Sequence, residues 1–259
     1  MGHERIGFLP RTKKWAEIVD KLASYDGDVD LVKQIADNTL SALQKKYLAM
    51  ALDESVIKAL SFLATLSYSA KQENQADYLN ANGYSVDSAL SLHSLISSAQ
   101  NLVATENGSL EVNKIARDAA LQAVVEFQRE HSSSQFSFFG ENQNNVWESA
   151  GTGAAFCELA RSFFAAFTER QLKYYLEREA ANSIGDYVKL ELFIKQLSEH
   201  TNAISDHSFD ISKITQSFAA GWYNKNAASA LPDEEQIKGF LNHSFGKLRE
   251  EFRREGEDK

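Results

Sequence analysis

Apolar residues recur along most of this chain at intervals of three and four residues, the spacing that places side chains on one face of an α-helix. Between Asp53 and Ala64, for example, the apolar positions follow this period directly after an aspartate that can cap a first helical turn. Because the pattern returns throughout, we predict an all-α protein, built as a multi-helix bundle or as stacked αα-hairpins. The predicted helices cover approximately residues 12–25, 28–43, 54–69, 87–104, 110–130, 146–181, 186–204, 210–228 and 232–254, with a short helix and a turn within 71–85.

Proline and glycine indicate where these helices begin and break. The only prolines are Pro10 and Pro232, so no proline removes a backbone donor from the helices between them. Pro232 stands directly before Asp233 and two glutamates, a composition typical of a helix start. Gly151 and Gly153 predict a break near the start of the longest helix.

The clearest interruption of the helical pattern is the segment HSSSQFSFFGENQNN at residues 131–145, which is rich in serine and asparagine. We therefore predict two helical subdomains, at 15–130 and 146–255, joined by this Phe-bearing connector. A basic and aromatic N-terminal arm at 1–14 precedes them, and a frayed tail at 256–259 follows.

Composition narrows the classes of function. With 36 acidic residues against 27 lysines and arginines, the chain has a formal charge of −9, which disfavours broad capture of nucleic acid phosphates. The single cysteine, Cys157, cannot form an intramolecular disulfide and fits a reducing compartment. Since no apolar segment approaches the ~18 residues of a membrane helix, we expect a cytoplasmic protein without a membrane anchor.

Two segments contain candidate partner-binding residues. In the arm, basic and large apolar side chains alternate around one proline, so the basic groups can meet acidic protein or phosphate while the apolar groups fill a groove. In the connector, three phenylalanines are costly to leave in water and are expected to pack on this chain or on a partner. An arm folded onto its own first helices is the alternative. The candidate residues are Arg5, Phe8, Leu9, Arg11, Lys13, Lys14, Trp15, Phe136, Phe138 and Phe139.

The segment EHTNAISDHSFD concentrates groups that can bind a metal or transfer a proton, namely His200, Asp206, His207 and Asp210. The alternative is that these residues are helix caps and exposed polar groups, because the composition near 205–210 predicts a helix end. The chain contains no His-Glu-x-x-His motif, no phosphate-binding Gly-Lys-Ser/Thr loop and no serine nucleophile elbow. We therefore assign no catalytic residue and no cofactor from the sequence.

Two segments, RIGFLPRTKKW at 5–15 and FTERQLKYYLEREA at 167–180, resemble parts of uncharacterised helical accessory proteins encoded in bacterial antiphage defence gene clusters. The resemblance covers about a tenth of the chain and carries over no functional residue. It implies a subunit that acts beside enzymes encoded by neighbouring genes.

The leading hypothesis is a non-enzymatic helical scaffold or adaptor subunit of an intracellular bacterial complex. One alternative is a metal-dependent hydrolase or nucleic-acid-processing enzyme that uses the histidine and aspartate cluster. Another is a nucleic-acid-binding module in which the local basic patch of the arm meets phosphates and Phe8 or Trp15 stacks on bases. The oligomeric state stays open.

Overall fold

The computed structural model describes residues 12–102, 110–132, 146–209 and 218–257, and within these ranges every regular element is a helix. The all-α prediction is confirmed. The N-terminal part contains α1 (Lys13–Ala23), α2 (Val29–Ala42), α3 (Gln44–Ala49), η1 (Met50–Leu52), α4 (Glu54–Ser69), α5 (Gln75–Ala81), α6 (Leu92–Leu102) and α7 (Leu110–His131). The C-terminal part contains η2 (Val146–Gly151), α8 (Gly153–Ser183), α9 (Tyr187–Phe209), α10 (Phe218–Asn226) and α11 (Glu234–Glu257).

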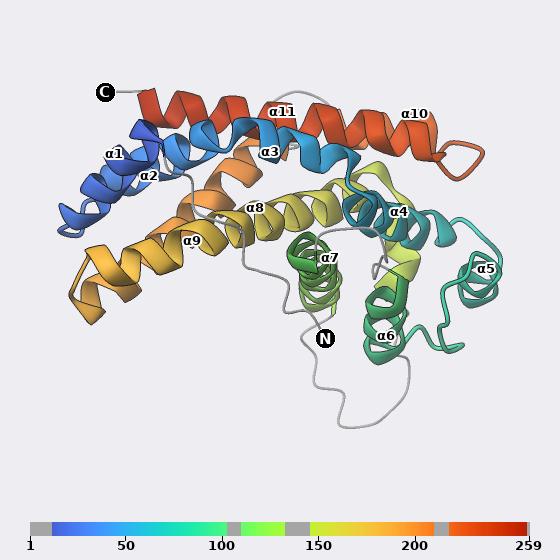
Figure 1. The fold of residues 1–259 in the computed structure, drawn as a ribbon. Coiled ribbons are helices and arrows are strands. Elements are labelled where there is room, and N and C mark those ends of the chain that lie inside the picture. Colours follow the sequence, from blue (N-terminus) through green and yellow to red (C-terminus); the bar gives the residue numbers. More distant parts are fainter. Residues whose placement is uncertain (1–11, 103–109, 133–145, 210–217, 258–259) are drawn as a thin grey trace.

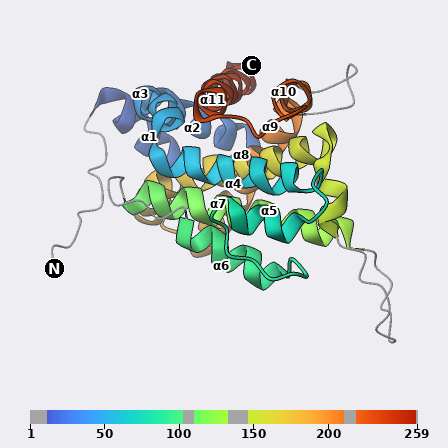
Figure 2. The same ribbon diagram turned by 90° about the vertical axis from the view of Figure 1, so that its right-hand side faces the viewer.

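Helix α8 lies at the centre of the bundle, with α7, α9 and α10 packed against it and α11 above it (Figure 1). Figure 2 shows α11, α4, α7 and α6 following one another from the top to the bottom of the molecule. With 31 residues, α8 extends over about 46 Å. Its fully buried phenylalanines include Phe156, Phe163, Phe164 and Phe167, and apolar residues occur around its circumference, as expected for a helix surrounded by others.

Polar side chains start these helices where the sequence predicts it. The carboxylate of Asp28 accepts the amide of Asp30 at 3.0 Å, and that of Asp53 accepts the amide of Ser55 at 2.9 Å. At the start of α11, Asp233 and Gln236 exchange backbone-to-side-chain hydrogen bonds of 2.8 and 2.9 Å, a reciprocal cap that satisfies two free amides.

Two boundaries differ from the prediction, and a third falls outside the described residues. Helix α6 begins at Leu92 rather than near 87, because the side chain of Asp87 accepts the amide of Ser91 at 2.8 Å and Leu90 has a φ of 49°. Helix α9 continues to Phe209 instead of ending near 204. The predicted helix at 210–228 is described only from Phe218, since 210–217 lie outside the described residues.

The elements on the two sides of 131–145 share one hydrophobic core. Helix α7 packs along α8, and the side chain of Gln75 donates to the Trp147 carbonyl at 3.0 Å. Within the described residues, helices from both sides of the predicted boundary therefore pack together, and the division into two subdomains stays a prediction. The connector itself lies outside the described residues.

Helices α2 and α11, which lie far apart in the sequence, are joined by a buried ion pair. Arg249 Nη1 lies 2.9 Å from Asp37 Oδ1, and the side chains of these two residues are only 12% and 13% exposed. The other terminal nitrogen of Arg249 donates to the Ser41 hydroxyl. This contact fixes the last helix of the chain against one of the first.

Candidate functional site

Only part of the predicted histidine and aspartate cluster lies within the described residues. Among the described residues, no group of three or more histidine, cysteine, aspartate or glutamate side chains is arranged to hold a metal ion. Asp206 is exposed and pairs with Arg161 at 3.2 Å. The side chain of His207 and the whole of Asp210 lie outside the described residues.

His200 is a core residue. Its side chain packs edge-on against Phe252, with ring centroids 5.2 Å apart, and its buried Nε2 has no hydrogen-bond partner among the residues that the structure describes. Burial, with a smaller contribution from the positive charge of Lys33, lowers the pKa of His200 to about 4. The neutral imidazole therefore contributes to the packing of α9 on α11.

Acidification is expected to destabilise the fold through His200. The unfolded chain, in which a histidine titrates near ~6.5, takes up this proton more readily than the folded chain. Stability is therefore lost as the pH falls from ~6.5 towards the folded-state pKa of about 4. Between pH 7 and pH 5, the free energy of unfolding should fall by about 2 kcal/mol more in the wild type than in His200→Gln. Urea unfolding at the two pH values measures this, and equal losses would contradict it.

The candidate partner-binding residues are only partly within the described chain. Lys13 and Lys14 are exposed on the first turn of α1. Trp15 is only 5% exposed and lies edge-on to Tyr175 of α8, so its indole packs in the core rather than on the surface. Trp15 therefore packs on helices of its own chain, as in the alternative interpretation of the arm. Outside the described residues lie Arg5, Phe8, Leu9, Arg11, Phe136, Phe138 and Phe139.

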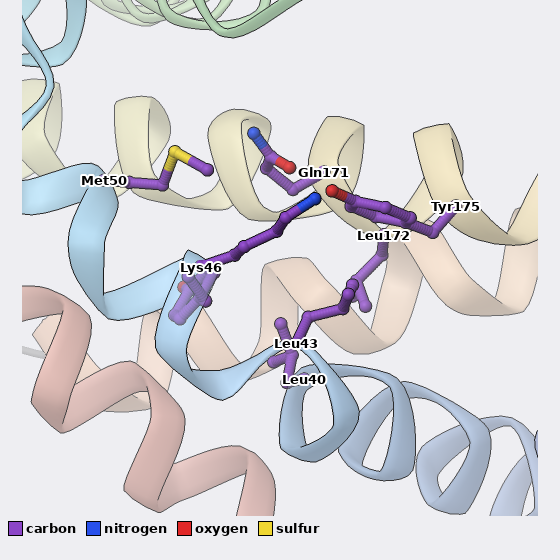
Figure 3. Close-up of a pocket in the computed structure, with 8 residues that line it drawn as sticks. Leu40, Leu43, Lys46, Met50, Gln171, Leu172 and Tyr175 are labelled. Carbon is purple, nitrogen blue, oxygen red and sulfur yellow. The ribbon is translucent and has the colours of Figure 1, made fainter. Parts of the chain in front are cut away.

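A small hollow lies between α2, α3 and α8 (Figure 3). Its volume is about 250 Å³ including space open to solvent, which is below the ~300–1,000 Å³ of typical ligand sites. Lys46 extends across it, with its amine 5.9 Å from the centre of the Tyr175 ring. The walls are mostly apolar, so this hollow presents no arrangement for bond-making chemistry. The lining residues are Leu40, Leu43, Lys46, Tyr47, Met50, Gln171, Leu172 and Tyr175.

The most unusual surface is formed where the α1–α2 turn meets the start of α9, at the lower left of Figure 1. Val29, Tyr187, Val188 and Leu192 are 47%, 72%, 73% and 38% exposed, and we call these four residues the exposed apolar end. A Cβ added to Gly27 would meet Leu192 Cδ2 at 3.6 Å, so the two segments are in direct contact.

The base of the exposed apolar end is held by specific contacts. The Tyr25 hydroxyl donates to Gln196 Oε1 at 2.6 Å, and Gln196 Nε2 donates to the Gly27 carbonyl at 3.1 Å. Tyr25 also packs edge-on against Phe193, with centroids 5.4 Å apart. Because one side chain of α9 both accepts from and donates to the α1–α2 turn, the surface above it is preformed.

Two left-handed glycines shape the turns on either side of this surface. Gly27 has a φ of 114°, and Gly185, between α8 and α9, has a φ of 67°. Directly after Gly185, the carboxylate of Asp186 accepts the amide of Lys189 at 3.0 Å. These turns project Tyr187 and Val188 from the first turn of α9 into solvent.

The exposed apolar end has an acidic surrounding. Within three positions of its four residues, the sequence contains five carboxylates and two lysines, and with Lys33, which pairs with Asp30 at 3.6 Å, the local charge is −2. Four of the five acidic residues are exposed and Asp30 is partly exposed. The carboxylates are those of Asp26, Asp28, Asp30, Asp186 and Glu191, and the lysines are Lys189 and Lys195.

Helical periodicity alone does not reveal this surface. Phe193 and Leu197 form the buried stripe of α9, whereas Val188 and Leu192 lie one turn apart on another face. Apolar residues outside the buried stripe are the available signal. It is weak because single exposed apolar residues are common on proteins.

Comparisons with protein-family models, with curated proteins and with solved structures find no match to this chain. Within the described ranges, no helix combines the length and the apolar composition needed to cross a membrane.

Proposed function

We propose that this chain is a non-enzymatic helical scaffold or adaptor subunit of a protein complex inside a bacterial cell. The observation that supports this function best is the exposed apolar end, where Tyr187 and Val188 are each more than 70% exposed on a preformed base. Contiguous exposed apolar side chains indicate a binding surface, because burying each one in an interface contributes roughly 1.5–3 kcal/mol.

The other exposed large apolar residues of the described chain lie on elements that do not form the exposed apolar end. Leu52 is on η1, and Leu110 and Val125 are on α7. Isolated exposures of this kind are ordinary on a protein surface. The clustering at the start of α9 therefore distinguishes the exposed apolar end.

The charged side chains of the bundle also fit a structural role. Glu169 of α8 accepts from Lys173 and, at 2.6 Å, from the Ser198 hydroxyl of α9, and these hydrogen bonds help keep its pKa below the ordinary value. Such groups connect helices to one another. The resemblance of residues 5–15 and 167–180 to antiphage accessory proteins supports defence against phage as the setting, beside enzymes encoded by neighbouring genes.

Purification from the native cell tests this function. Chains with a C-terminal tag should recover specific partners, identified by mass spectrometry, and Tyr187→Ser with Val188→Ser should reduce their recovery at least about tenfold. Leu52→Ser is the matched control, because it removes a side chain that is 64% exposed on a different element. The same partners at the same yield from all three chains would rule out the exposed apolar end as the binding surface.

A further inference from the structure

We propose that the exposed apolar end binds residues 1–11 of the N-terminal arm of a second copy of this chain. The inference rests on the proposed function, because it names one partner for the same surface. Each copy has one arm and one apolar end, so two copies can exchange arms reciprocally in a closed two-fold dimer.

The arm has the chemistry that the exposed apolar end requires. Its apolar residues can cover Val188 and Leu192, while its arginines face the acidic surrounding with its local charge of −2. A guanidinium pairs with a carboxylate through two parallel hydrogen bonds, which orients the arm as well as attracting it. Residues 4–11 contain three large apolar side chains and two arginines against one acid: Ile6, Phe8, Leu9, Arg5, Arg11 and Glu4.

Pro10 reduces the cost of binding. Its ring fixes φ and it has no amide proton, so it disfavours a helical conformation of the preceding residue. An extended segment with fewer accessible conformations loses less entropy when it is ordered on a surface. The sequence Phe8-Leu9-Pro10 thus favours an extended apolar segment between the two arginines.

The length of the arm favours a second copy over the same chain. Helix α1 runs from Lys13 towards the exposed apolar end, and its 11 residues cover about 16 Å. To reach the exposed apolar end of its own chain, the arm would have to reverse direction at Thr12 and run back along α1. Phe8 lies five residues before Lys13 and reaches at most about 17 Å from it, so no residues remain to form that reversal. A second copy does not meet this restriction.

The mass of the purified full chain in solution tests the inference. Light scattering after size exclusion at a series of concentrations should show a dimer, and deletion of residues 1–11, which keeps the Thr12 cap of α1, should give a monomer. Tyr187→Ser with Val188→Ser should raise the dimer dissociation constant at least about tenfold, and the Leu52→Ser control should leave it unchanged. Urea unfolding of each variant verifies that it is folded.

A mixing experiment determines which surfaces meet. The arm-deleted chain still has an intact apolar end, and the Tyr187→Ser, Val188→Ser chain still has an intact arm. A mixture of the two should form a heterodimer through one arm-to-end contact, although each chain alone is largely monomeric.

A full chain that is monomeric at all concentrations, or a dimer that survives deletion of the arm, would overturn the inference. Partner recovery distinguishes a failure of this inference from a failure of the proposed function. If the full chain is monomeric but the apolar-end variant still loses its native partners, only the second copy is excluded. If partner recovery does not depend on this surface either, both proposals fail.

Discussion

Replacing Arg249 with alanine is expected to lower the free energy of unfolding by about 3 kcal/mol, because the buried carboxylate of Asp37 then loses its 2.9 Å partner. The hydrogen bond to the Ser41 hydroxyl is lost as well. Since these contacts join α2 to α11, the variant should also loosen the last helix. Denaturant unfolding followed by circular dichroism measures the loss.

Arg253→Ala is the matched control on the same helix. Arg253 pairs with Glu250 at 2.6 Å, but its side chain is 41% exposed, so its removal should cost less than about 1 kcal/mol. A loss of similar size in the two variants would show that burial does not strengthen the contribution of the Arg249 pair.

Phe164→Ala is expected to lower the free energy of unfolding by about 4 kcal/mol, because it leaves a cavity where α8 meets α11. The ring is fully buried, edge-on to Phe245 with centroids 5.2 Å apart, and it also lies 6.2 Å from Phe240. Phe164→Leu, which fills part of the space, should lose clearly less. Chemical denaturation of the two variants tests the order.

Val125→Ala provides the surface reference for this comparison. Val125 is 40% exposed on α7, so its truncation should change stability by no more than about 0.5 kcal/mol. If Phe164→Ala cost as little as this reference, the α8–α11 contact would not be the close-packed core described above.

Much of the fold was predictable from helical periodicity and caps. Helix α4 has the predicted bounds of 54–69, and the break before α8 falls at Gly151 and Gly153. Local composition was a poorer guide where tertiary contacts decide the outcome. Helix α9 passes through the polar residues near 205 because Ser205 is buried and donates to the Arg161 carbonyl at 2.9 Å.

The candidate site was less predictable, because exposure depends on which helix faces are covered. Trp15 belongs to a basic-aromatic segment that suggests a surface, yet α8 covers its ring. Val188 lies outside the buried stripe of α9, and no described element covers it. The sequence shows that both residues are apolar, but it does not specify which helix, if any, covers each of them.

The contact between Asp37 and Arg249 joins residues 212 positions apart, and this separation has a consequence during synthesis. Helix α11 must be synthesised before α2 gains this partner, so a nascent chain exposes the part of α2 that packs on α11 until then. Chains that stall before α11 therefore resemble folding intermediates with uncovered apolar surface, the species that chaperones bind and that aggregate most readily.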